Sequence, residues 1–278
     1  MDVKFCSSLQ EMVMKNAPSF RGSWIFYTSI LKIAPKKLRF CSLVESNIHL
    51  DLTDPAQFSI VNTRKGKHEV GTVNFLKKYL SKGDVFIDIG ANFGYFSCIA
   101  SKIVGDEGLV LAFEPNNTAY IQLISTMTRN KLFNCLPVKM ALGEHENATM
   151  NMKKAWFKQS TSSYMTSGSS VLSNKFDSFS RSLSIAKKVK IIKIDVEGAE
   201  LPVLKGLAAL LLKDKPLLIV EPDNNSQKRF GFKFSELISY LASLGYKPTL
   251  FVDPSGDGAL IDYKEGLTEV CPVVFMPS

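Results

Sequence analysis

The sequence has few residues of the kinds that bind metal ions or build a disulfide framework. Its 278 residues include three isolated histidines and five widely spaced cysteines, and no two cysteines form a Cys-x-x-Cys pair. This spacing argues against zinc ribbons and thioredoxin-like chemistry, and we predict no metal site. Most of the cysteines lie in apolar stretches, which predicts buried free thiols in a reducing, cytoplasmic environment.

Long apolar runs are also missing. No run reaches the roughly 18–20 residues that a helix needs to cross a bilayer. The best N-terminal candidate, residues 23–34, is too short, contains Lys32 and is not followed by a small-residue cleavage site. We therefore expect no membrane span and no signal peptide.

The composition is that of a globular protein, and its positive charge is unevenly distributed. Hydrophobic residues make up 45% of the chain and charged residues 22%. The net charge is +8, and residues 1–82 hold 13 Lys and Arg against 6 Asp and Glu, whereas the rest of the chain holds 21 against 20. The basic N-terminal part is either a solvated surface or a face for an acidic partner such as nucleic acid, an anionic glycan or a lipid headgroup.

Residues 1–66 predict an extension of short helices and a β-hairpin. Helical patterns cover residues 8–17 and 23–33, and Pro35 stops the second of them. Residues 38–61 alternate apolar and polar side chains, in "NIHLDL" and then in "AQFSIV". This alternation is typical of a small antiparallel hairpin.

Residues 67–278 predict one α/β domain. After a helix over residues 67–80, strands alternate with helices of 10–14 residues, which is typical of βαβ units and a parallel sheet. The expected strands cover residues 84–89, 108–114, 135–142, 188–196, 216–222, 246–253 and 270–277. No helix separates the last two strands, so they are expected to form an antiparallel pair. The pattern predicts a Rossmann-like, seven-stranded, mostly parallel sheet with helices on both faces.

Four of these strands end in carboxylates. The strand-end acids are Asp88, Glu114, Asp195 and Glu221. Ligands of open α/β sheets bind at the carboxyl ends of the strands. Like charges gathered there cost free energy unless a ligand or a cation offsets them.

The turn after the first strand indicates the chemistry of the ligand. Gly90 and Gly94 allow a sharp turn, but the Gly-x-x-x-Gly spacing differs from the Gly-x-Gly-x-x-Gly of dinucleotide binders, which argues against an NAD-type oxidoreductase. Glu114, 20 residues after Gly94, is placed to accept two hydrogen bonds from a ribose diol. Together with Asp88, it suits a ligand with a ribose, little phosphate and positive charge. S-adenosylmethionine has all three features, and NAD shares only the ribose.

The sequence resembles the FkbM family of S-adenosylmethionine-dependent methyltransferases in two signature segments, "DVFIDIGANFGYFSCIASKIVGDEGLVLAFEPN" and "IIKIDVEGAELPVLKG". "LDLTDPAQFSI" and "GKHE" resemble the segment that leads into them, and the resemblance covers about residues 45–276. It implies a class I methyltransferase fold. Two departures lie on the acceptor side. Only "KFDSF" remains of the segment before the second signature, after a strand that looks shortened, and Pro222 follows Glu221 where the family often has a histidine.

The resemblance implies a site for S-adenosylmethionine. The implied cofactor-binding residues are Glu69, Asp88, Gly90, Asn92, Gly94, Glu114, Pro115, Asn116, Ala141, Leu142 and Asp195. Residues 88–94 would line the methionine and ribose side, and Glu114 would hold the ribose hydroxyls in a loop shaped by the two residues after it. Ala141 and Leu142 would lie against the adenine. Glu69 would close over the cofactor.

The resemblance also implies transfer of a methyl group to oxygen, on a hydroxyl of a sugar, a lipid-linked glycan or another secondary metabolite. Such a transfer needs an aligned acceptor and a base for the hydroxyl proton. Asp195 and Glu197 are the predicted catalytic residues, although Asp195 alternatively serves only the cofactor. Lys193 shares a strand face with Asp195, which predicts an ion pair with a strand-end acid.

Several alternatives stay open. His145 could serve as the base, and "EPDNN" from Glu221 onward could hold Mg²⁺ together with Asp195. The Ser-rich residues 159–173 are either a lid over the acceptor or a disordered loop. A nucleic-acid methyltransferase or binding protein that uses the basic N-terminal part is the alternative function, although the aromatic residues there lie in an apolar stretch typical of helix packing.

Overall fold

The computed structural model describes most of the chain. The described residues are 3–5, 23–33, 35, 39–43, 48–62, 69–154, 163–165, 169–183, 187–222, 230–252, 260–262 and 272–278. Within them, no helix combines the length and the apolar character that crossing a membrane requires. The helix predicted over residues 8–17 lies outside them.

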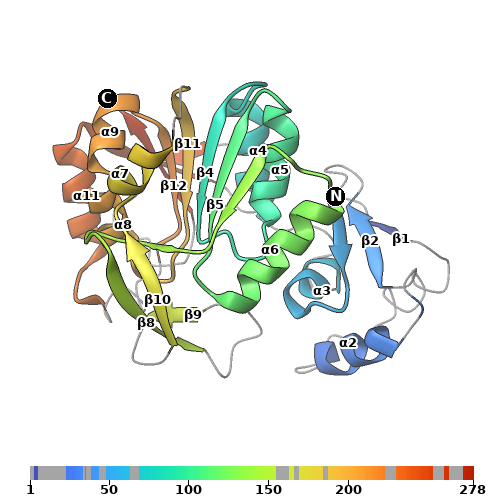
Figure 1. Ribbon diagram of the computed structural model, residues 1–278. Helices are drawn as coiled ribbons and strands as arrows, with labels where there is room; N and C mark the ends of the chain where they lie inside the picture. The colour runs from blue at the N-terminus through green and yellow to red at the C-terminus, as the bar shows by residue number, and fades with distance from the viewer. Residues whose placement is uncertain are drawn as a thin grey trace.

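An eight-stranded sheet forms the centre of the molecule (Figure 1). Its strands are β4 (Val85–Ile89), β5 (Leu109–Phe113), β6 (Cys135–Val138), β11 (Val189–Ile194), β12 (Leu217–Val220), β13 (Tyr246–Val252), β14 (Leu260–Asp262) and β15 (Val273–Pro277). They lie in the order β14-β13-β15-β12-β11-β4-β5-β6. The strands from β12 to β6 in this order are parallel, and β15 is antiparallel to both of its neighbours. The predicted seven-stranded sheet with an antiparallel last pair is confirmed, and β14 extends its edge.

Helices cover both faces of this sheet, as predicted. One face carries α4 (Val70–Tyr79), α5 (Tyr95–Val104) and α6 (Asn117–Arg129), and the other carries α8 (Glu200–Gly206), α9 (Ala208–Asp214) and α11 (Phe234–Ser243) (Figure 1). Successive strand residues point to opposite faces. Phe86 of β4 therefore packs in the first core, and Val85 and Ile87 pack in the second. The helical segment after β11 is divided between α8 and α9.

A second sheet of four strands follows β6. Its strands are β7 (Ala141–Leu142), β8 (Ala148–Lys154), β9 (Ser163–Met165) and β10 (Ser169–Asn174), in the order β7-β10-β8-β9. The prediction that the third strand runs to Leu142 is wrong, because that strand ends at Val138 and β7 pairs in parallel with β10. The Ser-rich segment is also partly a strand, since β10 pairs with β8 and leads into α7 (Phe176–Phe179). Residues 155–162 and 166–168 lie outside the described part.

The described residues of the N-terminal part form a small antiparallel sheet and two helices. These elements are β1 (Val3–Phe5), α2 (Ser23–Ile33), β2 (Phe40–Leu43), β3 (Ile48–Asp51) and α3 (Pro55–Asn62). The hairpin is present as β2 and β3, but the strand predicted for "AQFSIV" is wrong, because these residues belong to α3. Asp54 begins this helix, since its Oδ1 accepts a hydrogen bond of 2.8 Å from the backbone N–H of Gln57. The cap gives the backbone N–H of Gln57 a hydrogen-bond partner at the start of a helix. In a strand, that N–H would need a partner on a neighbouring strand instead.

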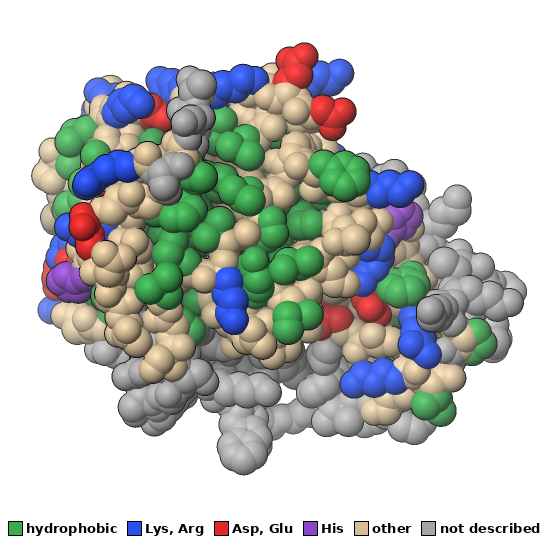
Figure 2. Space-filling view, viewed as in Figure 1, with side chains coloured by type: hydrophobic (Ala, Val, Ile, Leu, Met, Phe, Trp, Pro, Cys, Tyr) green, Lys and Arg blue, Asp and Glu red, His purple; other side chains and the backbone are tan. Residues whose placement is uncertain are grey.

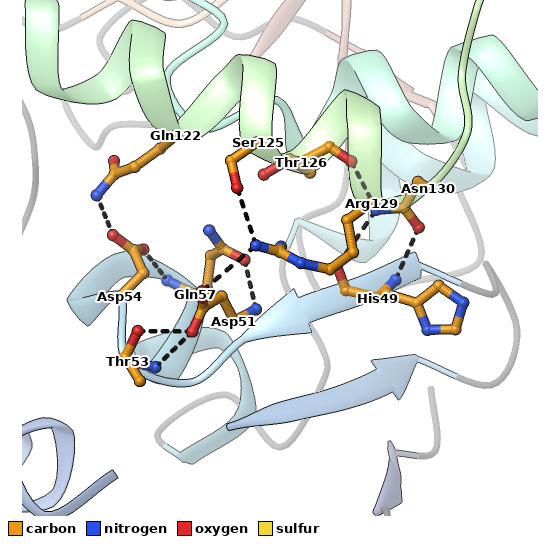
Figure 3. Close-up of polar contacts among 10 residues, drawn as sticks. All are labelled: His49, Asp51, Thr53, Asp54, Gln57, Gln122, Ser125, Thr126, Arg129 and Asn130. Carbon is orange, nitrogen blue, oxygen red and sulfur yellow. Dashed lines mark hydrogen bonds and ion pairs between the residues drawn. The ribbon is translucent and has the colours of Figure 1, made fainter. Parts of the chain in front are cut away.

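Side chains of α6 hold the N-terminal hairpin and α3 in place (Figure 3). Arg129 Nη2 lies 3.3 Å from Asp51 Oδ2, and the guanidinium carbon lies 4.8 Å from the ring centroid of Phe40. Toward the start of the helix, Gln122 Nε2 donates a hydrogen bond to Asp54 Oδ2. The N-terminal elements are therefore joined to the helix that follows β5.

Backbone contacts and the apolar core also connect the N-terminal elements to the rest of the chain. Asn130 accepts a hydrogen bond of 2.8 Å from the backbone N–H of His49 and donates one of 3.2 Å to its carbonyl oxygen. One hydrophobic cluster contains both Leu50 of β3 and Phe86 of β4. The predicted division into an extension over residues 1–66 and a domain over 67–278 thus does not follow a break in the core, and it stays a prediction.

Asp54→Ala is expected to lower the free energy of unfolding by about 0.5–2 kcal/mol, because it removes the cap of α3. Urea denaturation measures this loss. Asp54→Asn keeps an oxygen for the N–H of Gln57, so it should lose less. An Ala variant as stable as the wild type would show that α3 does not depend on the cap.

The surface shown in Figure 2 mixes apolar and charged side chains. Apolar side chains gather over the middle of this face, and Lys and Arg side chains lie scattered around them.

The cysteines of the described part are buried, as predicted. Cys41, Cys98 and Cys135 are free thiols. Burial raises the pKa of Cys98 to about 12. This thiol is therefore neutral at physiological pH, which argues against a role as a nucleophile.

Candidate functional site

The parallel strands end level with one another. Three register pairs set this level: Ile89 with Phe113, Ile89 with Ile194, and Ile194 with Val220. The first residue after each strand falls in one row, which consists of Glu114, Gly90, Asp195 and Glu221. Backbone hydrogen bonds of 2.9–3.0 Å from these residues to the neighbouring strand ends continue the ladder. We call these four residues the rim row; it brings three of the four strand-end acids together.

Glu114 has a carboxylate fixed by two backbone N–H groups. Its Oε2 accepts a hydrogen bond of 2.9 Å from Asn92, and its Oε1 accepts one of 2.8 Å from Asn116. Burial raises the pKa of Glu114 to about 7, against the opposing effect of these hydrogen bonds. A carboxylate has about four lone-pair sites. Each oxygen can therefore accept a further hydrogen bond from a ligand.

Asp88 lies below the rim row, beside Lys193 in the register of β4 and β11. It is buried, and its Oδ2 accepts a hydrogen bond of 2.6 Å from the Ser97 hydroxyl. Burial raises the pKa of Asp88, whereas Lys193 and Ser97 favour its ionised form. The structure thus places this acid two residues deeper in the sheet than the other strand-end acids.

Gly90 and Gly94 form the turn between β4 and α5. Their φ angles are +84° and +90°, and Asn92 between them has a φ of 53°. A Cβ atom on Gly90 would lie 1.8 Å from the carbonyl oxygen of Asp195. The turn after β4 is therefore in direct contact with the backbone after β11.

Lys193 lies beneath the rim row and pairs with two of its acids. Its Nζ is 3.1 Å from Asp195 Oδ2, 3.7 Å from Glu221 Oε2 and 4.7 Å from the ring centroid of Phe96. Burial lowers the pKa of Lys193, but the surrounding carboxylates, led by Asp195, outweigh burial and raise it. The side chain is thus a permanent cation. The sequence predicted an ion pair with one strand-end acid, and the second pair depends on strand order.

Glu221 and Glu69 complete the acidic surroundings of Lys193. Burial, followed by Asp195 and Glu69, raises the pKa of Glu221. The Oε2 atom of Glu221 is buried and has no hydrogen-bond partner among the described residues. Glu69 precedes α4 and has a φ of 45°. A non-glycine residue in this conformation stores strain, which is common in binding sites.

Glu197 and Glu200 follow Asp195 but have different environments. Glu197 has a φ of 55° and helps to raise the pKa of Glu221, so it lies on the rim side. Glu200 is fully buried, and its Oε1 accepts a hydrogen bond of 2.8 Å from the N–H of Gly198. This contact is typical of an acid that stabilises the start of a helix.

The remaining predicted cofactor residues lie beyond β5 and β6. Asn116 caps α6, since its Oδ1 accepts hydrogen bonds of 2.9 and 3.1 Å from Thr118 and Ala119, and Pro115 links it to Glu114. Ala141 and Leu142 are buried in β7 of the second sheet rather than at the end of β6. Their predicted contact with adenine therefore depends on the small sheet, which sequence patterns did not reveal.

The geometry gives little support to His145 as the base or to a Mg²⁺ site at Glu221 and Asp195. His145 is exposed in the turn after β7, and its Nε2 lies 3.8 Å from Glu144 Oε1. Among the residues that the structure describes, no three His, Cys, Asp or Glu side chains are grouped to hold a metal ion. Residues 223–225 of "EPDNN" are not among them.

The strand order, the glycine turn and the acidic rim row define a Rossmann-like α/β fold with a candidate ligand site at the carboxyl ends of its strands. The chain also matches the Methyltransferase FkbM domain over residues 88–248, which is more than half of its length. It therefore belongs to the FkbM methyltransferase family, as predicted.

The three relatives described next have low sequence identity to this chain. The hexuronic acid methyltransferase AglP of Haloferax volcanii is 28% identical over 148 residues, which are 53% of this chain and 59% of that protein. The crystal structure of the methyltransferase FkbM from Methylobacillus flagellatus KT is 17% identical, covers 90% of this chain and 58% of its own, and has a TM-score of 0.49. A methyltransferase structure from Aquifex aeolicus is 16% identical, covers 80% of this chain and 97% of its own, and has a TM-score of 0.43.

Proposed function

We propose that the rim row and its surroundings bind S-adenosylmethionine. The supporting observation is a cluster of acidic groups, because the ammonium group of Lys193 is surrounded by the carboxyl groups of Asp195, Glu69, Glu221 and Asp88. Such a cluster is costly unless a ligand adds positive charge. S-adenosylmethionine carries a sulfonium and an ammonium group, so its chemistry fits this site.

Each predicted cofactor residue has a proposed place. Glu114 would accept hydrogen bonds from the ribose hydroxyls with its remaining lone pairs, and Asp195 would face the amino end of the cofactor. Glu69 would approach from α4. The other proposed contacts are Asp88, Gly90, Asn92 and Gly94 on the methionine and ribose side, Pro115 and Asn116 in the ribose loop, and Ala141 and Leu142 at the adenine.

The proposed reaction transfers a methyl group to a hydroxyl oxygen. The bound co-substrate supplies an activated methyl group, and the protein positions the acceptor and handles its proton. Asp195 and Glu197 are the proposed catalytic carboxylates because they follow β11 at the rim. Lys193 Nζ lies 3.1 Å from Asp195 Oδ2 and so fixes the position of that carboxylate.

A sugar or glycan is the proposed acceptor. AglP, the relative described above, is a hexuronic acid methyltransferase. This likeness favours a sugar hydroxyl over a lipid or another secondary metabolite. The nucleic-acid alternative is tested by an electrophoretic mobility shift at two salt concentrations, and the lack of a shift at low salt rejects it.

Calorimetric titration with S-adenosylhomocysteine, with NAD⁺ as the control ligand, tests the cofactor. We expect micromolar binding of the first and no binding of the second. Binding of NAD⁺ alone, or of neither ligand, contradicts the proposed site.

Glu114→Ala is expected to weaken S-adenosylhomocysteine binding by about 10- to 300-fold, because charge-assisted hydrogen bonds to the ribose are lost. Calorimetric titration measures the change. Glu107→Ala, at an exposed position, is the control and should bind as the wild type does. An unchanged affinity in Glu114→Ala would mean that the ribose does not bind there.

The affinity for S-adenosylhomocysteine is expected to rise with pH. The pKa of Glu114 is about 7, and the ribose hydroxyls donate to the ionised carboxylate. Affinity should therefore fall by up to about tenfold per pH unit below 7 and level off above it. Titrations between pH 6 and 8 measure this dependence, and Glu114→Gln should lose the part that Glu114 contributes. A wild-type affinity that is constant over this range contradicts the prediction.

A further inference from the structure

Glu221 is the member of the rim row without a role so far. It follows β12, next to Asp195 in the row, and its side chain is 20% exposed. Its Oε2 atom is buried and has no hydrogen-bond partner among the described residues. Buried carboxylate oxygens are usually hydrogen-bonded, so a rim oxygen that has an ion pair but no hydrogen bond calls for a functional explanation.

Lys193 lies at different distances from its two acidic partners, Asp195 and Glu221. Its Nζ donates a hydrogen bond to Asp195 Oδ2 at 3.1 Å, but it lies 3.7 Å from Glu221 Oε2, which is beyond hydrogen-bond distance. Asp195 Oδ2 therefore has a hydrogen-bond donor in Lys193. Glu221 Oε2 lies near the same ammonium group but accepts no hydrogen bond from it.

The charged groups around Glu221 set its protonation. Asp195, Glu69 and Glu197 are acids that oppose its ionisation, and Lys193 is the cation that favours it. With burial, the acids prevail and raise the pKa of Glu221. A positive charge that arrives at the rim would shift this balance toward the carboxylate.

We propose that Glu221 is a further catalytic residue, which becomes ionised when the positively charged co-substrate binds and then accepts the proton of the acceptor hydroxyl. This proposal rests on the proposed function. The hydroxyl proton passes to the Glu221 carboxylate while the O–CH₃ bond forms and the C–S bond breaks, with the electron pair of the latter remaining on sulfur. The carboxyl group afterwards releases its proton to solvent.

Proton release on ligand binding tests the proposal without any acceptor. Calorimetric titrations at pH 7 in two buffers of different ionisation enthalpy count the protons released. Wild-type protein should release more protons with S-adenosylmethionine than with S-adenosylhomocysteine, whose sulfur is uncharged. The contribution of Glu114 is common to both ligands, since both contain the ribose, and so it cancels in the difference.

The difference between the two ligands should vanish in Glu221→Gln and persist in Glu107→Gln, the same substitution at an exposed position. A difference that persists in Glu221→Gln overturns the proposal. If the wild type binds neither ligand, the proposed function itself fails. If the wild type binds both ligands and the difference in proton release persists in Glu221→Gln, only the role of Glu221 is rejected.

Turnover gives a second readout, with a glucuronic acid glycoside as the probe acceptor. Glu221→Gln should lower kcat by about 100- to 10,000-fold, the usual contribution of a general base. Urea denaturation of Glu221→Gln should give a free energy of unfolding close to that of the wild type, which separates this loss from unfolding. A variant with wild-type kcat would overturn the proposal.

Discussion

Gly90→Ala is expected to destabilise the protein by about 2–6 kcal/mol and to abolish S-adenosylhomocysteine binding. The φ of Gly90 is +84°, a conformation that costs other residues about 1–3 kcal/mol. The added Cβ would also lie 1.8 Å from the carbonyl oxygen of Asp195, and overpacking of this kind costs about 1–3 kcal/mol more. Relief requires β4 and β11 to move apart at the rim. Urea denaturation and calorimetric titration measure the two effects.

Gly245→Ala is the matched control for this substitution. Gly245 has a similar φ of +81°, but a Cβ there would have no atom of the described residues within 4 Å. It should therefore show only the conformational cost, about 1–3 kcal/mol, and keep its ligand affinity. If Gly90→Ala is no more destabilising than Gly245→Ala, the close approach of the two backbones is not important for the site.

The level ends of the strands were predictable because their signals are local. β4, the Gly90 turn and α5 follow one another directly, and their pattern depends only on neighbouring residues. Parallel strands of similar length end at one edge of the sheet. The sequence therefore places Glu114, Asp195 and Glu221 together without knowledge of the strand order.

The depth of Asp88 and the two partners of Lys193 were not predictable in the same way. Both depend on the register between β4 and β11 and on the position of β12 beside β11. These strands are far apart in the sequence, and periodicity does not reveal which residues face one another across strands. The 3.7 Å separation between Lys193 Nζ and Glu221 Oε2 depends on the position of β12 beside β11, so it also had no local signal.

Two errors in the fold have separate physical causes. "AQFSIV" alternates like a strand, but the cap from Asp54 to Gln57 favours a helix over that pattern. Leu142 was assigned to the third strand because apolar residues continue past Val138. Pairing with Ser173 and Asn174 of β10 instead draws Ala141 and Leu142 into the second sheet.

Lys193→Met is expected to lower the free energy of unfolding by about 3–5 kcal/mol at neutral pH, the usual cost of removing one partner of a buried ion pair. Methionine keeps much of the side-chain volume and removes the cation. Asp195 and Glu221 then lose the positive charge at 3.1 and 3.7 Å, and Asp88 loses its neighbour in the register. Urea denaturation measures the loss, and Lys190→Met, at an exposed position on the same strand, is the control.

The loss in Lys193→Met should depend on pH in a defined direction. Without the cation, burial and mutual repulsion raise the pKa values of the buried acids above their values in the unfolded chain. The folded state then binds more protons than the unfolded state, so the stability of the variant falls as pH rises through the folded pKa values and recovers as pH falls. The variant should therefore be closer to the wild type at pH 5.5 than at pH 8.

Adding Asp195→Asn and Glu221→Gln to Lys193→Met removes the uncompensated charges. This triple variant should recover part of the lost stability at pH 8 and become less sensitive to pH, because neutral amides can be buried at lower cost than carboxylates. A triple variant as unstable as Lys193→Met alone would mean that the lysine stabilises the core by packing against Phe96 rather than through its charge. If the triple variant does recover stability, the positive charge of Lys193 is what allows the acids of the rim row to lie together at the end of the sheet before a cationic ligand binds.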